Sequence, residues 1–417
     1  MSQPKLHIHT DCEFFSGSEN MIANLVNSNQ FRREFELTLS YRETSAYSLG
    51  LMKRFKLPIP LYPLKLFRFR ADRKLKIKES KFHSIYNIVW HSIEIIPISL
   101  SNIIRLYILL LRIRPRILHI NNGGFPGALS CRMAVVAGKM ARVKTITMVV
   151  NNMAIDYSHP FRWFDFASDR FISKNVELFI TGSKVAVDRL QKVLKFSSSK
   201  GINIPNGVEI RNKPEGKEKT SQRLGVSGFD GTVFGFVGIM LPRKGHLFLF
   251  RIVRSMVEMY PREWESIMIL VEGEGNNFAT LRKYVSENSL DRYIKFIGSE
   301  SNIFNLLSII DVLVYPAAED EDFPNIISEA MALSKPVIST KVAGAVEQIV
   351  NLETGLLIDI DSEFDFGFAM MSLAQNRRIR EKMGLMGRKR FEDQFTIEHS
   401  VLCYVRHYKR LINESFE

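Results

Sequence analysis

The chain has 417 residues, of which 46% are hydrophobic, and this length predicts two or three domains with ample cores. Its net charge of +13 is concentrated in the first half: residues 1–205 carry 31 Lys and Arg against 14 Asp and Glu, and the remainder carries 26 against 30. Cys12, Cys131 and Cys403 lie far apart in no ligand spacing, which favours reduced, cytoplasmic thiols over a disulfide framework. Polar residues interrupt the most apolar window, residues 85–111, so we expect no membrane span.

The N-terminal segment has the pattern of a strand, a loop and a helix. Residues 5–9 have the pattern of a strand, and residues 10–20 form a loop that holds Gly17 between two serines. Helical spacing begins at Met21. Such a loop can bring backbone N–H groups against a phosphate, although an ordinary strand-to-helix turn explains the same residues.

A strongly basic segment follows at residues 53–81. Its Lys and Arg side chains are interleaved with Leu, Tyr and Phe, and its acids are Asp72 and Glu79. This mixture favours docking on an anionic membrane surface. A polyanionic acceptor, a nucleic acid or a solvated basic face would account for the same composition.

The rest of the first half alternates between strand and helix patterns. Strand patterns lie at residues 116–120, 144–150 and 176–180, and helical patterns lie at 127–141 and 183–194. This alternation predicts a parallel, doubly wound sheet.

A second α/β series begins after a polar run, residues 213–221, that has the composition of a linker. Its strand patterns lie at residues 232–238, 266–271, 293–297, 309–315, 336–340 and 355–358. We therefore predict an N-terminal Rossmann-like domain (1–205), a linker (206–225), a C-terminal Rossmann-like domain (226–395) and a C-terminal helix (396–417) that packs back on the first domain.

An acidic corner stands out in the second half. The apolar run 309–315 leads into four acids, residues 319–322, and Phe323-Pro324-Asn325 then opens a helical pattern. The N-terminus of a helix has free N–H groups and a positive dipole, so it can receive an anion or the hydroxyls of a polar ligand. Glu321 lies in the loop, and Glu329 lies eight residues later in the helix.

A basic turn precedes this corner in the chain. Residues 236–238 end a strand, and Leu-Pro-Arg-Lys-Gly-His follows at 241–246 before a helix. Lys244 beside a glycine can reach an anion held over such a turn, and Arg243 adds a bidentate donor. We predict ligand binding here.

Five motifs stand in the same order as in a known family: Val-Gly-x4-Arg-Lys-Gly, Glu-Gly-Glu-Gly, Phe-Ile-Gly, Asp-Val-Leu-Val-Tyr-Pro and Glu-Asp-Phe-Pro-Asn-x3-Glu. Through them residues 234–357 resemble the nucleotide-sugar-binding domain of retaining glycosyltransferases of family 4, which have the two-domain GT-B fold. The first half resembles the family more loosely, for example through Gly-Ser-Glu-Asn at 17–20.

The resemblance implies roles for individual residues. Glu321 would lie at the donor sugar, Glu329 would take the ribose hydroxyls, and Lys244 would neutralise the departing diphosphate. Gly17 would let its loop approach the same phosphates. Backbone groups around Phe323, Pro324 and Asn325 would face the donor, a UDP- or GDP-linked sugar. No metal or other cofactor is implied, because cationic side chains can stabilise the leaving diphosphate.

Three departures from the family pattern are visible. Ile239 stands where the family often has Arg, and Arg243 is the candidate substitute. Asn151-Asn152 stands where the family has a His, so we assign no general base there. Asp322 replaces a usual glycine and adds an acid beside the predicted sugar site.

The leading hypothesis is a metal-independent transferase, peripheral on the cytoplasmic face of the membrane, that glycosylates a glycan or lipid-linked acceptor in bacterial surface polysaccharide assembly. The first alternative is a nucleotide-sugar 2-epimerase, for which no convincing acid/base set stands out. A metal-dependent transferase would use Asp320 and Asp322 as ligands. A nucleic-acid-binding protein would leave the acidic corner unexplained, so we expect no nucleic acid partner.

Overall fold

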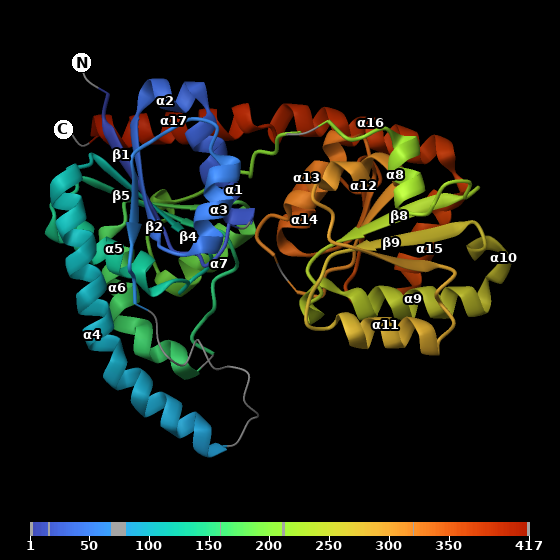
Figure 1. The fold of residues 1–417 in the computed structure, drawn as a ribbon, viewed down its shortest axis with the longest axis horizontal. Helices are drawn as coiled ribbons and strands as arrows, with labels where there is room; N and C mark the ends of the chain where they lie inside the picture. The colour runs from blue at the N-terminus through green and yellow to red at the C-terminus, as the bar shows by residue number, and fades with distance from the viewer. Residues whose placement is uncertain are drawn as a thin grey trace. The chain divides into compact units, whose positions relative to one another are not determined.

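The computed structural model describes residues 3–15, 17–67, 81–158, 160–210, 213–319 and 321–414, and for residues 81–95, 160 and 161 only the course of the backbone. The chain divides into two compact units (Figure 1). Unit 1 comprises Met1–Ile204 with Val401–Glu417, and unit 2 comprises Pro205–Ser400. The stretch 206–225, predicted as a linker, falls within unit 2 and contains a short helix, α8 (Lys217–Arg223).

Unit 1 contains a parallel seven-stranded sheet in the order β3-β2-β1-β4-β5-β6-β7. The central strands β4 and β5 are buried along their whole length, as expected for a parallel sheet covered on both faces. The strands are β1 (Lys5–Thr10), β2 (Glu36–Arg42), β3 (Leu61–Leu64), β4 (Ile117–Asn122), β5 (Thr145–Val150), β6 (Leu178–Thr181) and β7 (Gly201–Asn203).

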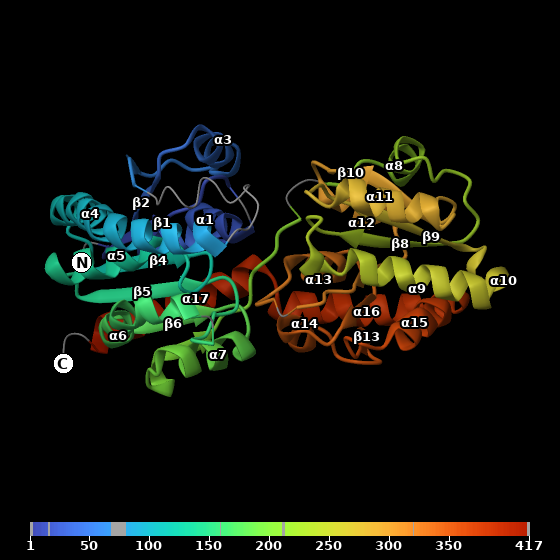
Figure 2. The same ribbon diagram turned by 90° about the horizontal axis from the view of Figure 1, so that it is seen from below.

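Helices cover both faces of this sheet (Figure 2). The helix α17 begins in unit 2 and continues into unit 1 from Val401 onward. Its Tyr408 is buried against His119 of β4, and the Tyr408 hydroxyl lies 2.6 Å from Nδ1 of His119. The helices are α1 (Gly17–Asn27), α2 (Asn29–Glu34), α3 (Ser45–Arg54), α4 (Lys81–Ile113), α5 (Leu129–Met140), α6 (Phe166–Asn175), α7 (Lys184–Leu194) and α17 (Ile397–Glu414), with short 3-10 turns at Pro160–Asp165 and Ser198–Lys200.

Unit 2 contains a parallel six-stranded sheet in the order β10-β9-β8-β11-β12-β13. The strands are β8 (Thr232–Val237), β9 (Ile267–Glu272), β10 (Ile294–Gly298), β11 (Val312–Tyr315), β12 (Val337–Thr340) and β13 (Gly355–Ile358). Beside α8 the helices are η4 (Pro242–Lys244), α9 (His246–Met259), α10 (Pro261–Trp264), α11 (Phe278–Glu287), α12 (Ile303–Ile309), α13 (Asn325–Ala332), α14 (Ala343–Gln348), α15 (Glu363–Gln375) and α16 (Arg377–Gln394). Two apolar clusters, one on each side of the sheet, form its core.

The predicted parallel, doubly wound architecture is confirmed in both units. The predicted strand at 309–315 is too long, because Ile309 ends α12 and β11 begins only at Val312. The strands β2, β3 and β7 have no counterpart in the prediction. From residue 68 onward, the basic segment 53–81 lies outside the residues whose side chains the structure describes.

Candidate active site

The strand order of unit 2 indicates the end of the sheet at which a ligand would bind. From β8 the chain proceeds to β9 and β10 on one side, and it returns to β11, β12 and β13 on the other. In open α/β sheets, ligands bind beyond the carboxyl ends of the strands where this reversal occurs. The turn after β8 carries Lys244, and the loop after β11 carries Glu321, so both residues follow the strands that flank the reversal.

The turn after β8 is fixed against the end of β11. Gly245 has a φ of 78°, and a Cβ at this position would lie 1.6 Å from the carbonyl oxygen of Pro316. The amide of Ala318 donates to the carbonyl of Arg243 at 2.8 Å. Only glycine allows this close approach with positive φ. The glycine therefore holds Arg243 and Lys244 next to the acidic loop.

Glu321 is the centre of the resulting polar cluster. Its carboxylate accepts from the ammonium of Lys244, with the nitrogen 2.6 Å from Oε1 and 2.7 Å from Oε2. Arg243 donates to Oε1, and the hydroxyl of Tyr315 donates to Oε2. The Lys244 nitrogen also lies 5.5 Å from the centre of the Tyr315 ring. One buried carboxylate thus has two cations and a phenol as partners.

Burial and charge act against each other on these groups. Burial alone would raise the pKa of Glu321, but Lys244, Tyr315 and Arg243 together hold that pKa below its ordinary value. Burial lowers the pKa of Lys244, with Glu321 opposing and Arg243 adding to the shift. The three partners therefore keep Glu321 ionised at neutral pH.

Helix α13 begins directly after this loop. Pro324 is its N-cap, and the first helical residue is Asn325, the last of the three residues predicted to open the helix. Phe323 is buried and packs edge-on against Phe395, with ring centres 5.6 Å apart, so its side chain belongs to the core. The side-chain oxygen of Asn325 accepts from Asn206 at 2.9 Å. The side chains of Phe323 and Asn325 therefore hold the N-terminus of α13 in place.

The second predicted acid, Glu329, lies one turn into α13 and is partly buried. Asp322 is buried beside Glu321. Gly344 packs against the loop that holds Glu321 and Asp322. Its amide donates to the carbonyl of Glu321 at 3.0 Å, and a Cβ at Gly344 would lie 2.0 Å from the carbonyl oxygen of Asp322. Glu321, Asp322 and Glu329 thus sit on one short loop and helix.

Two further glycines shape the adjoining turn after β9. A Cβ at Gly273 would lie 2.1 Å from the carbonyl oxygen of Gly238, and a Cβ at Gly275 would lie 2.9 Å from Met240. The backbone after β8 is therefore packed closely on the Glu-Gly-Glu-Gly turn. Behind it His246 is buried against Phe236, and burial lowers the pKa of His246 to about 4.

In unit 1 the strand order reverses in the same way, between β1 and β4. Gly17 begins α1 after β1, and a Cβ on Gly17 would meet nothing within 4 Å. Next to it Glu19 is fully buried and accepts from Thr10 at 2.8 Å and from Asn121, at the end of β4, at 3.2 Å. Asn151 donates to Asn121 at 3.0 Å, so its amide serves this network.

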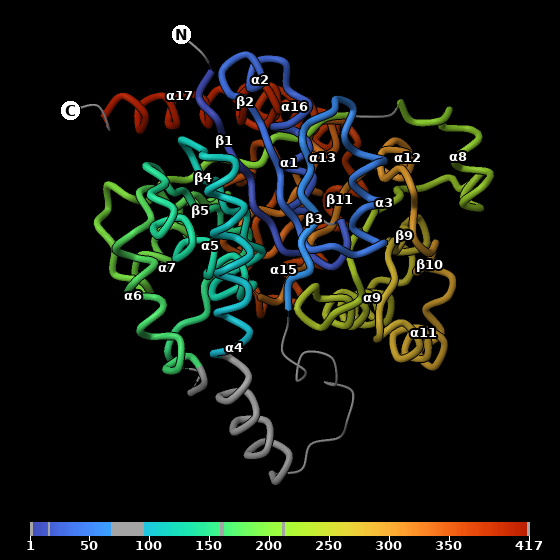
Figure 3. The backbone as a smooth tube through the Cα atoms, turned by 60° about the vertical axis from the view of Figure 1, so that its left-hand side comes forward, coloured from blue at the N-terminus to red at the C-terminus, as the bar shows by residue number. Residues whose placement is uncertain are grey.

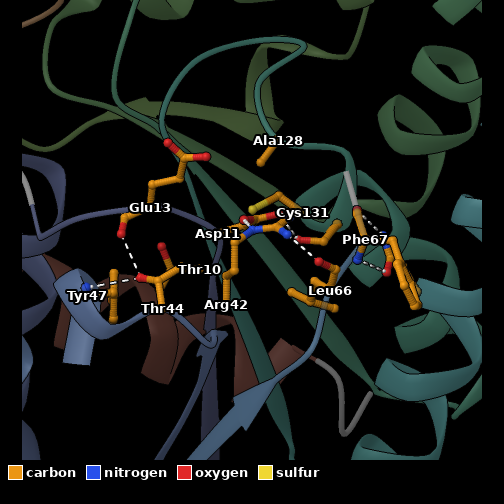
Figure 4. A network of polar contacts seen from close by, with 12 residues as sticks. Thr10, Asp11, Glu13, Arg42, Thr44, Tyr47, Leu66, Phe67, Ala128 and Cys131 are labelled. Carbon is orange, nitrogen blue, oxygen red and sulfur yellow. Dashed lines mark hydrogen bonds and ion pairs between the residues drawn. The ribbon is translucent and has the colours of Figure 1, made fainter. Parts of the chain in front are cut away.

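A second polar network ties the ends of β1 and β2 together (Figure 4). Arg42 donates to Asp11 through two nitrogens, at 2.5 and 2.8 Å, and through a third to the carbonyl of Leu66. Burial alone would raise the pKa of Asp11, but Arg42 holds it below its ordinary value. This pair fixes the segment that follows β3.

Lys244, Arg243 and Glu321 were predicted from the sequence to bind the ligand, and the structure brings them together in unit 2. Gly17 lies in unit 1 and is described there by itself. Tyr315 and Gly344 were not predicted as parts of the site. Tyr315 ends an otherwise aliphatic strand, and a hydroxyl at a strand end beside a ligand loop was the available signal.

Among the described residues there is no group of three or more His, Cys, Asp and Glu arranged to hold a metal ion. The metal-dependent alternative would use Asp320 and Asp322 as ligands, and of these two residues Asp320 lies outside the described part of the chain.

Residues 223–390 match the family described as "Glycosyl transferases group 1". Among curated proteins, a capsular polysaccharide biosynthesis glycosyltransferase, CapM of Staphylococcus aureus, is 28% identical over 54% of this chain and 57% of its own length. An N-acetyl-alpha-D-glucosaminyl L-malate synthase of Bacillus anthracis is 27% identical over 35% of this chain and 38% of its own length. The chain thus spans between a third and two thirds of these relatives.

Solved structures extend the likeness over the whole chain. Anabaena HepE in complex with UDP has a TM-score of 0.76 at 14% identity, covering 97% of this chain and all of that one. A variant of S. aureus TarM in complex with UDP and other ligands has a TM-score of 0.67 at 12% identity, covering 98% and 99%. The predicted GT-B fold is confirmed, and the likeness to the glycosyl transferases group 1 family covers residues 223–390 of unit 2.

Proposed function

We propose that the protein is a retaining glycosyltransferase of family 4 that moves a sugar from a UDP- or GDP-linked donor to a glycan or lipid-linked acceptor. The observation that carries the proposal is the buried contact of Lys244 and Arg243 with Glu321 at the sheet reversal of the region that matches the glycosyl transferases group 1 family. Structural neighbours with UDP bound support a nucleotide-sugar donor.

In the proposed reaction the bond from the anomeric carbon to the diphosphate oxygen breaks, and its electron pair leaves with the diphosphate. The acceptor oxygen bonds to the same face of that carbon, and its proton passes to a donor phosphate oxygen. Lys244 and Arg243 stabilise the charge that develops on the diphosphate, so no metal ion is required. These cations are held in place before the donor arrives, which lowers the reorganisation that the transition state needs.

Glu321 and Glu329 divide the recognition of the donor. Glu321 accepts hydrogen bonds from sugar hydroxyls, and its charge raises the pKa of Lys244 against the lowering effect of burial. Glu329, one turn into α13, accepts from the ribose hydroxyls. The N-terminus of α13, around Phe323, Pro324 and Asn325, faces the sugar and phosphate, and Gly17 lets the backbone of unit 1 approach the same phosphates.

The proposed setting is assembly of a bacterial surface polysaccharide, such as O-antigen, capsule or exopolysaccharide, on the cytoplasmic face of the membrane. The likeness to a capsular polysaccharide glycosyltransferase supports this setting. The basic surplus of residues 1–205 supports binding to an anionic membrane surface.

The test is incubation of the full chain with UDP- and GDP-sugars and lipid-linked acceptors in EDTA. The proposal expects a glycosylated lipid whose new linkage keeps the anomeric configuration of the donor. Release of an epimerised sugar without any acceptor would instead establish the 2-epimerase, and transfer that stops in EDTA would overturn the metal-free mechanism.

A further inference from the structure

Helix α4 of unit 1 carries an apolar stripe on its outer side. Its members recur every three or four residues and are exposed, Ile96 at 71% and Ile108 at 61%. The stripe consists of Ile96, Leu100, Ile104, Ile108 and Leu111. A helix on the surface of a soluble domain normally presents polar residues outward, so an apolar outer face is unfavourable in water and indicates an interaction site.

The inner side of the same helix is part of the core of unit 1. Leu106 and Leu110 are buried with residues of α5. Asn102 is fully buried and holds the segment after β3, accepting from the amide of Phe67 at 3.0 Å and donating to its carbonyl at 3.1 Å. By length and composition Ile96–Ile113 could cross a membrane. Its inner side, however, packs on unit 1, where the described part of α4 runs alongside α5 (Figure 3), so its outer side is the face left for another partner.

A basic cavity of about 390 Å³ lies at the C-terminal end of α4. Leu111 of the stripe lines it, and its charged lining consists of Lys5, Arg114, Arg116, Arg142 and Lys144, with no acidic residue. Within the described part of the chain, neither Arg114 nor Arg142 has a side-chain hydrogen bond or ion pair. Both have a positive φ, at the positions that follow α4 and α5. The cavity is at the amino ends of the strands, opposite the edge that carries Gly17.

The sequence extends this charge pattern. From residue 95 to residue 155 there is no Asp or Glu, whereas eight Lys and Arg are present. Lys5 pairs with Glu36 at 3.8 Å, whereas Arg114 and Arg142 have no acidic partner among the described residues. An aliphatic stripe beside two such cations is complementary to a lipid bilayer with anionic head groups. A protein partner would have to combine an apolar groove with acidic groups, whereas an anionic bilayer supplies apolar chains and acidic head groups over its whole surface.

We propose that the stripe and the cavity, together the α4 surface, bind an anionic lipid bilayer. The aliphatic side chains enter the acyl-chain region, and Arg114 and Arg142 take lipid phosphate groups in the cavity. This proposal rests on the proposed function in one respect: the proposed function places the protein at a membrane. It adds a docking surface that the basic segment 53–81 does not supply.

The experiment measures co-sedimentation of the full chain with vesicles of phosphatidylcholine alone or with one third phosphatidylglycerol. Ile108→Asp should weaken binding to anionic vesicles roughly tenfold or more, because one aliphatic side chain no longer enters the bilayer. Leu385→Asp on α16, equally exposed at 65%, is the matched control and should bind like the wild type.

The double variant Arg114→Asn/Arg142→Asn tests the cavity. Asn tolerates positive φ, so the backbone is kept. Binding to anionic vesicles should fall about thirtyfold, and the salt dependence should become shallower. Lys195→Asn is the matched control, since Lys195 is an exposed cation with a φ of 54° that follows another helix of unit 1.

Three results would overturn the inference. Equal binding of all variants would mean that another surface docks. Conversion of a dimer to a monomer by Ile108→Asp, with unchanged vesicle binding, would make the stripe a contact between copies of the chain. Thermal stabilisation by inorganic phosphate that requires Arg114 and Arg142, without vesicle binding, would make the cavity a site for free phosphate. The sedimentation assay contains no sugar donor, so its result does not depend on the proposed function. In a separate assay, a variant that loses vesicle binding but still transfers sugar to a soluble acceptor would separate this inference from the proposed function.

Discussion

Lys244 and Glu321 are 77 residues apart in the chain, yet the Lys244 nitrogen lies 2.6 Å from Oε1 of Glu321 in a largely buried ion pair. The pair joins the loops after β8 and β11, the two neighbouring strands at which the strand order of the parallel sheet of unit 2 reverses. Removing one partner of such a pair leaves the other charge buried and unpaired, which is costly. Lys244, which we assign to the diphosphate of the donor, is therefore held in place by Glu321, which we assign to the donor sugar.

Replacing Glu321 by Gln should separate its two roles. The substitution keeps the shape of the side chain and removes its charge, so Lys244 and Arg243 become available to phosphate. We expect binding of UDP or GDP to be unchanged or tighter by calorimetry, while sugar transfer falls by about a hundredfold or more because a charged partner is lost in the transition state. Weaker binding of the diphosphate would show that Glu321 only maintains the fold of the loop.

Gly245→Ala should damage the site through the backbone. The new Cβ meets the Pro316 carbonyl oxygen at 1.6 Å, so the turn that carries Lys244 must shift. Gly228→Ala is a close control, because Gly228 has the same φ of 78° but nothing within 4 Å of the new Cβ. Both variants should show the strain of positive φ, about 1–2 kcal/mol. Only Gly245→Ala should also raise KM for the donor, and equal donor KM in the two variants would contradict the placement of the turn.

Gly17→Ala distinguishes a role in binding from a role in folding. An added Cβ meets nothing within 4 Å, so the melting temperature should stay within a degree or so of the wild type. If the backbone at Gly17 approaches the donor phosphates, the methyl group should weaken donor binding severalfold. An unchanged donor KM together with an unchanged melting temperature would remove Gly17 from the site.

Three buried histidines make the stability of unit 1 depend on pH. Burial lowers the pKa of His7 to about 3, His9 to about 4 and His119 to about 3. Between their ordinary pKa near 6.5 and these values, the unfolded state binds protons that the folded state does not, so stability falls as the pH falls. Each contributes up to about 1.4 kcal/mol per pH unit.

The measurement is the midpoint of urea unfolding from pH 7 to pH 5, compared with that of His119→Gln. That variant should be less stable at pH 7, because the contact with Tyr408 changes, but its stability should fall less steeply with pH. A parallel decline in both proteins would show that His119 is protonated in the folded state.

The sequence predicted the fold through periodicity where the strands are apolar and bounded by turns, as at Gly355–Ile358, which matches residue for residue. It failed where an apolar run has two interpretations. Residues 309–315 are mainly apolar from the end of α12 to the end of β11, and periodicity alone does not locate the boundary between the two elements. The edge strand Leu61–Leu64 was hidden within a basic segment, whose composition suggested a surface rather than a sheet.

Lys244 and Arg243 could be predicted because a basic pair beside a glycine after a strand has few structural explanations. The contact with Glu321 could not be predicted, since it depends on β8 and β11 being neighbours in the sheet. Tyr315 was quoted as a motif residue, but its hydroxyl acquires a role only when the following loop folds back over the strand end. Such relationships arise from sheet order, which local sequence does not encode.

The most direct test of the proposed function is the transfer activity of Lys244→Ala, measured as kcat/KM with the donor that stabilises the wild type. We expect a loss of about a hundredfold to a thousandfold, because the leaving diphosphate loses its buried cation. Lys283→Ala, which removes an exposed lysine of α11, should retain the activity of the wild type. Full activity of Lys244→Ala in a folded protein would contradict the assignment of the donor site.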